Sequence, residues 1–507
     1  MRLSESVTAA ARTLRNRPTD LLPLYVLSAA VPTIGRVVTF LGLAVVYLRL
    51  AASGRLATAR EDLAALESEP PANDPDAVAE WSETLFSALE PLFTPGTTAV
   101  LVLAVLLTVA VIVVLYAGVT AGRLAACRAR LRGERGLVAG IAGVRRYWLS
   151  ILGLYLLEIL AWIGVTIGVG VLASLATGVT VTGVGDPIVA AFVGLLGGLL
   201  WLVAVLVVRA LFAFAPVAVV VDGVGAFRSV RHAAGFVRRR LSGAVFYYVL
   251  AVAAAVGSAV AAGVLSLVSV TALVPLVGTL LVFPVLDLIK TGLYADYRDP
   301  LAIPAPAERS LASQFAGGLR RGWAELAAFV RGRPGLHALA VATGLAGFGM
   351  GWVAIAPFEG TLEASIAARL EGHRPLGAAV EFFANNWTVA LTTAFGGVVL
   401  AVPAVVSIWF NGLMLGIYGR LEADPAELLA FVAPHGVLEI PAIFVAGALG
   451  IRLGVVGWQA WRGGLGRDGL ADELEGAFRV LVGVGLLLAV AGLIEGLVSP
   501  YYYRVLF

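Results

Sequence analysis

Long apolar runs, separated by short charged segments, dominate the first half of the chain. A hydrocarbon core about 30 Å thick is crossed by about 20 apolar residues of helix, so each run of that length predicts one membrane span. A spanning segment must satisfy its own backbone hydrogen bonds, which favours helices. The alternating ten-residue strands of a membrane barrel do not occur. Six spans are expected, at about 22–48, 97–120, 148–175, 187–213, 244–270 and 272–294.

The second half continues the pattern with one ambiguous segment. Residues 387–419 are too long for one crossing and contain Gly396-Gly397 and Pro403, so two short helices fit better than one long helix. One helix would leave the C-terminus inside, and two would place it outside. With two, the chain is an all-α polytopic transmembrane bundle of about 11 spans, six plus five. The other three expected runs are 336–357, 434–455 and 477–498.

Composition and charge support a membrane protein and argue against nucleic acid as a partner. The chain is 60% hydrophobic and only 14% charged, whereas a soluble domain carries about 25% charged residues. Arginines collect in short loops beside apolar runs, seven of them between Arg123 and Arg146, which is the positive-inside pattern. We therefore expect a multi-pass protein of the cell membrane with a cytoplasmic N-terminus and the C-terminus outside. Cys127 is the single cysteine, which excludes an intramolecular disulfide.

Composition shifts divide the chain into three parts. Residues 1–300 form a six-span domain with an acidic outer loop at 51–94. Residues 301–334 form a proline-broken linker followed by an amphipathic segment, and residues 335–507 form a second membrane domain. The amphipathic segment predicts an interfacial helix on the anionic inner leaflet. A helix that docks on a partner is the alternative.

Some charged residues inside the apolar runs have a plausible opposite charge nearby. Asp287 and Lys290 lie three residues apart in the sixth run, which favours a self-neutralising pair. Glu158 and Arg209 lie in neighbouring runs and could bridge two helices.

The segment from Pro434 to Ile443 places a histidine and a carboxylate inside an apolar run. His435 and Glu439 are four residues apart, about one helical turn, so both side chains share one face. Ionisable groups at membrane depth cost about 2.5–3.5 kcal/mol each by insertion scales, so they are usually paired and often functional. Pro434 suits the first turn of a helix, which would put His435 at a positive helix terminus.

In the eleven-span topology further polar residues converge on His435 and Glu439. Three interpretations remain open: a hydrogen-bonded cluster that fixes helix register, a site for an ion, proton or small solute, or a metal or catalytic site. Zinc prefers three or four ligands, and a third is visible only if Glu495 contributes. We therefore predict no catalytic residue, no metal and no cofactor. The full predicted intramembrane polar cluster is His435, Glu439, Glu495, Asn411, Asn385 and Asn386.

Small residues at four-residue spacing predict faces where helix backbones approach closely. Gly347 with Gly351 forms one such face in the first span of the second domain. Packing within the subunit is the simpler use of these faces, and a homodimer would use the same surface. The other predicted packing residues are Gly447, Gly450, Gly454, Pro441, Gly492 and Gly496.

Two resemblances accompany these patterns. The second half contains an ordered set of motifs: Asn385-Asn386, Gly396-Gly397, Asn411-Gly412, Leu415-Gly416, Pro434-His435-Gly436 with Glu439, Pro441-Ala442, Ala446-Gly447, Gly450 with Gly454, Ile494-Glu495 and Pro500. Through these motifs residues 335–500 resemble the stage II sporulation protein M family of integral membrane proteins, whose sporulation members look like scaffolds that hold cell-wall hydrolases at a septum. The first half contains Ala226-Phe227-Arg228-Ser229 and Tyr294-Ala295-Asp296-Tyr297-Arg298. Through these residues the segment 1–300 resembles the membrane domain attached to some glycerophosphodiester phosphodiesterases.

Together these features predict a non-enzymatic membrane scaffold. Its expected partners are the lipid bilayer and other membrane or envelope proteins that it organises. The alternative is a channel or transporter for an ion or small solute that uses the polar cluster.

Overall fold

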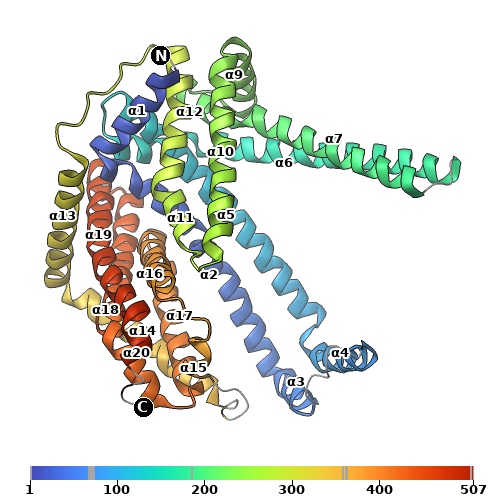
Figure 1. Ribbon diagram of the computed structural model, residues 1–507, viewed down its shortest axis with the longest axis vertical. Helices are drawn as coiled ribbons and strands as arrows, with labels where there is room; N and C mark the ends of the chain where they lie inside the picture. Colours follow the sequence, from blue (N-terminus) through green and yellow to red (C-terminus); the bar gives the residue numbers. More distant parts are fainter. Residues whose placement is uncertain are drawn as a thin grey trace. The chain divides into compact units, whose positions relative to one another are not determined.

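Helices form nearly all of the regular structure. The computed structural model describes residues 3–66, 75–183, 187–356, 359, 364–502 and 505. Within these ranges an isolated β-bridge joins Ala364 to Glu422, and the elements longer than one residue are helical (Figure 1). The predicted all-α class is confirmed.

The first 300 residues form helices α1 to α12. They are α1 Leu3–Asn16, α2 Leu22–Ala52, α3 Arg55–Ala64, α4 Pro75–Leu89, α5 Pro95–Leu131, α6 Gly136–Gly183, α7 Pro187–Ala213, α8 Ala215–Asp222, α9 Ala226–Arg239, α10 Leu241–Ser266, α11 Leu273–Val277 and α12 Phe283–Arg298. Shorter turns are η1 Pro18–Asp20 and η2 Glu90–Leu92, and a π-helical turn, η3 Gly278–Val282, joins α11 to α12. The predicted acidic loop therefore contains α3 and α4, and its residues 67–74 lie outside the described ranges.

The remaining residues form helices α13 to α20. They are α13 Leu311–Gly332, α14 Pro334–Ala354, α15 Ile366–Arg369, α16 Pro375–Gly396, α17 Val402–Leu421, α18 Pro425–Trp461, α19 Arg467–Leu497 and α20 Ser499–Tyr502. The long apolar run at 387–419 is thus divided between α16 and α17, so the preference for two helices over one is confirmed.

Ten helical segments among the described residues are long and apolar enough to cross a membrane, six before residue 300 and four after it. The chain is a multi-pass membrane protein. The expected eleventh span corresponds to α16, which is helical over 22 residues but is not among the ten. Its polar residues Glu381, Asn385 and Asn386 lower its hydrophobicity. The side of the membrane on which each terminus lies stays a prediction.

The chain divides into two compact units, and the three-part division expected from composition stays a prediction. Residues 31–113 form one unit, and residues 1–30 together with 114–507 form the other. In the smaller unit, the hydroxyl groups of Thr39 on α2 and Thr108 on α5 form a hydrogen bond of 3.0 Å, which connects these two long helices. The expected boundary at 301–334 lies inside the larger unit.

Polar contacts join the six-span part to the second membrane part within that larger unit. Glu381 of α16 accepts hydrogen bonds from the backbone N–H of Thr271 at 2.6 Å and of Ala272 at 2.8 Å, just before α11. At a separate place, Arg135 donates to Asp472 of α19 at 2.6 Å. Because each contact crosses residues 301–334, the linker does not separate two independent bodies.

The predicted charge pairs inside the apolar segments form. Lys290 lies 3.1 Å from Asp287, and Arg123 of α5 lies 3.6 Å from the same carboxylate. Arg209 of α7 lies 3.0 Å from Glu158 of α6. Each carboxylate in these pairs therefore faces at least one cation, which offsets the cost of removing it from water.

The amphipathic helix α13 packs against its own chain. Gly322 of α13 lies so close to Val482 and Gly483 of α19 that a Cβ would contact the backbone nitrogen of Gly483 at 3.0 Å. Leu326 is buried at the same contact, whereas Trp323 remains half exposed. Whether its exposed side rests on a lipid surface stays a prediction.

Helices α14 and α17 interlock through glycine backbones. A Cβ atom on Gly347 would overlap the carbonyl oxygen of Trp409, and a Cβ atom on Gly412 would overlap the carbonyl oxygen of Gly344. The two helices therefore touch backbone to backbone, which only small residues allow. Gly351 and Gly416 make the same kind of contact one turn further along each helix.

The turn between α16 and α17 is strained and closely packed. Leu400 and Ala401 adopt left-handed backbone conformations, with φ of 57° and 63°, which is costly for residues other than glycine. The turn lies against glycines of α18, because a Cβ on Gly450 or Gly454 would clash with residues 393–404. The packing of α18 thus holds this turn in place.

The α14–α17 contact gives a direct stability prediction. Gly412→Ala should lower the stability of the purified protein by about 1–3 kcal/mol, because the added methyl group overlaps backbone and pushes the two helices apart. Gly349→Ala is the matched control, since a Cβ at Gly349 meets nothing within 4 Å. It should be neutral or slightly stabilising. Thermal unfolding in detergent measures both, and equal midpoints for the two variants would contradict the interlock.

Candidate functional site

One continuous helix carries the histidine and the first glutamate of the predicted cluster. α18 begins at Pro425, where the side chain of Asp424 accepts hydrogen bonds from Ala426 N at 2.9 Å and Glu427 N at 3.2 Å. Pro434 therefore lies inside the helix, and the expectation that it opens one is wrong. The cap at Asp424 followed by a proline is the stronger start signal.

This correction also changes the electrostatic environment expected for His435. The residue was expected at a positive helix terminus, but it lies more than two turns into α18. The helix dipole falls off within the first turn, so it has little effect on the imidazole. The neighbouring side chains decide what this histidine can bind.

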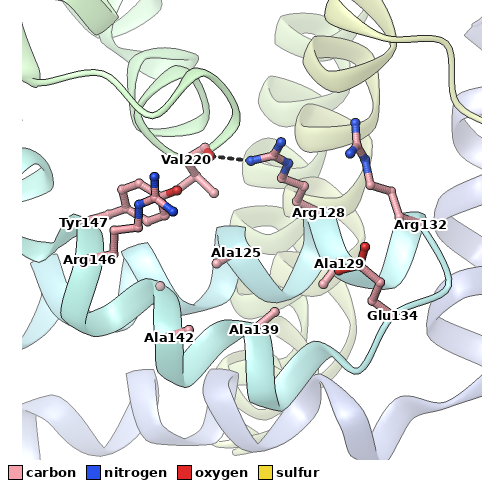
Figure 2. Close-up of a pocket in the computed structure, with 11 residues that line it drawn as sticks. Ala125, Arg128, Ala129, Arg132, Glu134, Ala139, Ala142, Arg146, Tyr147 and Val220 are labelled. Carbon is pink, nitrogen blue, oxygen red and sulfur yellow. Dashed lines mark hydrogen bonds between the residues drawn. The ribbon is translucent and has the colours of Figure 1, made fainter. Parts of the chain in front are cut away.

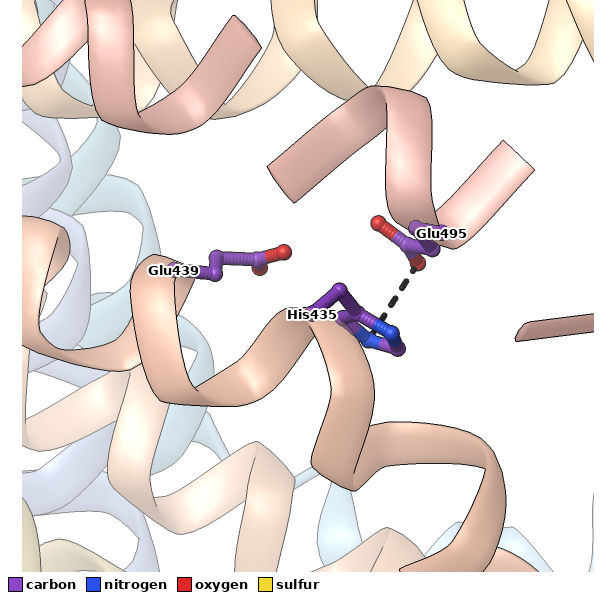
Figure 3. Close-up of side chains that lie close together, drawn as sticks. All are labelled: His435, Glu439 and Glu495. Atoms are coloured by element: carbon purple, nitrogen blue, oxygen red, sulfur yellow. Dashed lines mark ion pairs between the residues drawn. The ribbon is translucent and has the colours of Figure 1, made fainter. Parts of the chain in front are cut away.

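Three ionisable side chains converge between α18 and α19. His435 and Glu439 project from successive turns of α18 toward Glu495 of α19 (Figure 3). His435 Nε2 lies 3.9 Å from Glu495 Oε1, and one ligand atom from each of the three residues lies within 4.8 Å of the others. We call these three residues the His–Glu–Glu cluster.

Polar neighbours orient the His–Glu–Glu cluster. His435 Nδ1 lies 3.0 Å from the hydroxyl oxygen of Ser499, the first residue of α20. Glu439 forms side-chain hydrogen bonds with Glu495 and with Asn386 of α16. Asn385 donates in turn to the Asn386 side-chain oxygen at 3.2 Å. The cluster and its polar neighbours together come from four helices.

Burial makes the negative charge of the cluster costly. The His435 side chain is 7% exposed and that of Glu495 is 14% exposed. One oxygen of each glutamate, Oε2, is buried without a hydrogen-bond partner. Among the described residues, no arginine or lysine nitrogen forms an ion pair with Glu439 or Glu495, so a shared proton or a bound cation must relieve the repulsion between them.

The structure brings four of the six predicted polar residues together: His435, Glu439, Glu495 and Asn386. Asn385 is exposed and bonds to its sequence neighbour Asn386. Asn411 bonds to its own helix: its amide nitrogen donates to the carbonyl oxygen of Ser407, one turn earlier on α17, at 2.8 Å. An asparagine inside an apolar helix can satisfy itself on its own backbone in this way. Ser499 is the residue that sequence reasoning missed, because a single serine before Pro500 carries no signal of its own.

The predicted packing glycines lie at helix contacts within the chain. A Cβ on Gly447 would clash with Ile408 of α17, and one on Gly450 would lie 2.5 Å from the Ala404 Cβ of the same helix. A Cβ on Gly492 would lie 2.9 Å from the Ala379 carbonyl oxygen of α16. Gly454 faces the turn at Ala401, Gly496 faces α16 near Pro375, and Pro441 is exposed on the surface of α18.

A second candidate is an arginine-lined cavity of about 260 Å³ between α5, α6 and α8 (Figure 2). Arg128 donates to the Val220 carbonyl oxygen at 2.8 Å, and Arg132 pairs with Asp299 at 3.0 Å. Arg146 stacks over the Tyr147 ring at 5.3 Å. All three arginines thus have partners within the chain, which makes this cavity a weaker candidate than the His–Glu–Glu cluster.

Another feature that sequence reasoning missed is the buried Glu422, just after α17. Its carboxylate accepts a hydrogen bond from Ile366 N at 3.1 Å and lies 3.8 Å from Arg369. Burial raises the pKa of this carboxyl, and Arg369 and the Ile366 hydrogen bond oppose the shift only in part. Its Oε2 atom has no hydrogen-bond partner. Glu422 anchors α15 to the end of α17.

Comparison with known proteins finds one family. Residues 339–500 match the family model described as stage II sporulation protein M, which confirms the resemblance expected for this part of the chain. The matched segment contains all three residues of the His–Glu–Glu cluster. No curated protein and no solved structure matches the chain. The match does not extend to the N-terminal half, where the second resemblance stays a prediction.

Glu422 gives a pH-dependent stability prediction. A carboxyl whose folded pKa is raised contributes stability that is fully present below its unfolded pKa and is lost as pH rises through the folded pKa. Glu422→Gln should therefore gain stability relative to wild type as the pH rises from 4 to 8. Thermal unfolding across this range measures the difference. Glu371→Gln, an exposed glutamate nearby, is the control, and parallel curves for all three proteins would refute the prediction.

Proposed function

We propose that this chain, whose residues 339–500 form a stage II sporulation protein M domain, is a non-enzymatic scaffold that organises partner proteins in the envelope or membrane. The observation that carries this proposal is an exposed surface on α4 and η2. These elements lie between two candidate spans and so project beyond the membrane-crossing helices. We call this surface the acidic aromatic face; it comprises Asp76, Glu80, Glu83, Phe86, Glu90 and Phe93.

The acidic aromatic face combines two features of a protein-binding surface. Phe86 is 72% exposed and Phe93 is 66% exposed, and aromatic anchors of this kind dominate binding energy at protein interfaces. Asp76, Glu80 and Glu83 follow one another at helical spacing, so they share one side of α4. Residues 75–93 contain no arginine or lysine.

Charge favours a protein partner over lipid. Anionic headgroups repel an acidic surface, whereas a basic protein surface is complementary to it and would associate faster. We therefore expect the partner to be a protein whose surface carries basic residues and binds the exposed phenylalanine side chains. Contacts such as Glu381 with Thr271 support a scaffold role because they tie the stage II sporulation protein M domain to the membrane helix that precedes residue 271.

The scaffold proposal predicts loss of partner binding when the aromatic anchors are removed. Phe86→Ser/Phe93→Ser should reduce co-purification of a stoichiometric partner from native membranes by about tenfold or more, as for interface hot spots. Thermal stability should change little, because both side chains are exposed. Mild-detergent affinity purification with quantitative mass spectrometry measures the recovery.

Matched variants make this experiment decisive. Phe315→Ser on α13 changes an equally exposed phenylalanine, at 70%, outside the acidic aromatic face and should leave recovery unchanged. Glu439→Gln should also leave it unchanged, since a scaffold does not need the His–Glu–Glu cluster for docking. A wild-type protein that purifies alone, or a partner retained by the double variant, would refute the proposal.

A second candidate role, cation translocation, rests on the unpaired carboxylate oxygens of Glu439 and Glu495. Transporters build ion sites from polar side chains beside broken helices. Here α16 and α17 are separated by the strained turn at Leu400 and Ala401, and α18 carries both Glu439 and the glycines that hold this turn.

If the cluster translocates protons, the Glu439→Gln variant should fold but should not conduct protons. The amide keeps the shape of the side chain and removes its charge. Proteoliposomes containing a pH-sensitive dye should acidify with wild type under an inward proton gradient, and the variant should match protein-free liposomes. Asn411→Ala is the control, because Asn411 bonds to its own helix, and it should conduct normally. A wild type that does not conduct removes this candidate.

A further inference from the structure

The histidine of the His–Glu–Glu cluster presents one ring nitrogen to a carboxylate and the other to a hydroxyl. When Nδ1–H donates to Ser499 Oγ, at 3.0 Å, Nε2 carries a lone pair. That lone pair faces Glu495 Oε1 at 3.9 Å, so two acceptors face each other with Glu439 close by. Three groups that can act as ligands thus lie within 4.8 Å of one another in a buried setting, and a cation could replace the proton of the hydrogen bond between the two glutamates.

We propose that His435, Glu439 and Glu495 bind one divalent transition-metal ion of the Zn²⁺ class. An imidazole with two carboxylates is a donor set that suits such ions, whereas Mg²⁺ and Ca²⁺ prefer oxygen ligands alone. The charge balances as well, because two carboxylates and a neutral imidazole carry the charge that a divalent ion neutralises. Three protein ligands leave one position for water, as in open zinc sites.

The distances require only a small adjustment. Ligand atoms around a tetrahedral zinc ion, at about 2.0–2.2 Å from the metal, lie about 3.4 Å from one another. The Nε2–Oε1 distance of 3.9 Å is about half an ångström longer, and the whole set spans 4.8 Å. The largest separation in the set therefore exceeds the tetrahedral value by about 1.4 Å, and the proposal requires the glutamate side chains to rotate inward by this amount. The oxygens that would rotate inward include the unpartnered Oε2 atoms of both glutamates.

Neighbouring polar side chains support the ligands as outer partners do in metal sites. Ser499 Oγ lies 3.0 Å from Nδ1 and accepts its proton in the tautomer that leaves Nε2 free to bind the ion. Asn386 bonds to Glu439 and so fixes the orientation of that carboxylate. These supports come from α20 and α16, so a bound ion would brace four helices of the domain.

The metal-site inference is independent of both proposed roles, because an ion can brace a scaffold or occupy a transport path.

Equilibrium binding to the full-length protein in mild detergent tests the site. After chelator treatment and desalting, wild type should take up one Zn²⁺ per chain, measured by calorimetry and by elemental analysis. His435→Gln and Glu495→Gln should each weaken Zn²⁺ binding at least tenfold. Ser499→Ala removes a supporting group only and should weaken it by about 10–100-fold with the unfolding temperature preserved. Mg²⁺ should not compete.

Two controls separate this site from adventitious binding and from misfolding. His337→Gln removes a histidine whose Nδ1 lies 2.8 Å from the Arg333 carbonyl oxygen, outside the cluster, and should bind Zn²⁺ like wild type. Co²⁺ bound to wild type should show the visible absorption of a tetrahedral site, a readout that needs no variant. Wild-type binding no stronger than that of His435→Gln/Glu495→Gln, or a Co²⁺ spectrum typical of hydrated ion, would overturn the proposal. The scaffold proposal would survive either result, because its test measures partner recovery.

Discussion

The cost of leaving a polar group unsatisfied in the membrane interior constrains every level of this structure. Backbone groups avoid that cost by forming helices, which accounts for the nearly complete helical content. Charged side chains avoid it by pairing, as Asp287 does with Lys290 and Arg123, and Glu158 with Arg209. Since lipid provides no hydrophobic drive between helices, close glycine contacts such as those of α14 with α17 supply the packing.

The His–Glu–Glu cluster is the exception to this pairing. Its two carboxylates lie beside the imidazole of His435, which can be neutral, rather than beside an arginine or lysine. Each carboxylate has one buried oxygen without a hydrogen-bond partner. Asp287 and Glu158 each face a cation, whereas no arginine or lysine among the described residues pairs with Glu439 or Glu495, so this site can take up a positive charge. A proton and a divalent metal ion both satisfy that requirement, and the ligand geometry with its outer hydrogen bonds favours the metal ion.

The contacts across residues 301–334 change how the two membrane parts are understood. Glu381 and Arg135 join them at two places, so the stage II sporulation protein M domain lies in the same compact unit as residues 114–300. The acidic aromatic face, at residues 76–93, belongs instead to the smaller unit formed by residues 31–113. The His–Glu–Glu cluster between α18 and α19 is separate from the acidic aromatic face in the chain, and different experiments test the two sites.

The sequence alone determined the helical class, the membrane location, the charge pairs and the candidate residues His435, Glu439 and Glu495. These follow from hydrophobic run length, from opposite charges at helical spacing and from the rarity of ionisable groups in apolar segments. Only the tertiary structure decided that Asn411 bonds to Ser407, that Ser499 holds His435, and that Pro434 lies within a helix capped at Asp424. It also showed that α16 is not among the ten helical segments that are long and apolar enough to cross a membrane. Those outcomes depend on which helix faces approach one another, and local spacing carries no information about contacts between residues far apart in the chain.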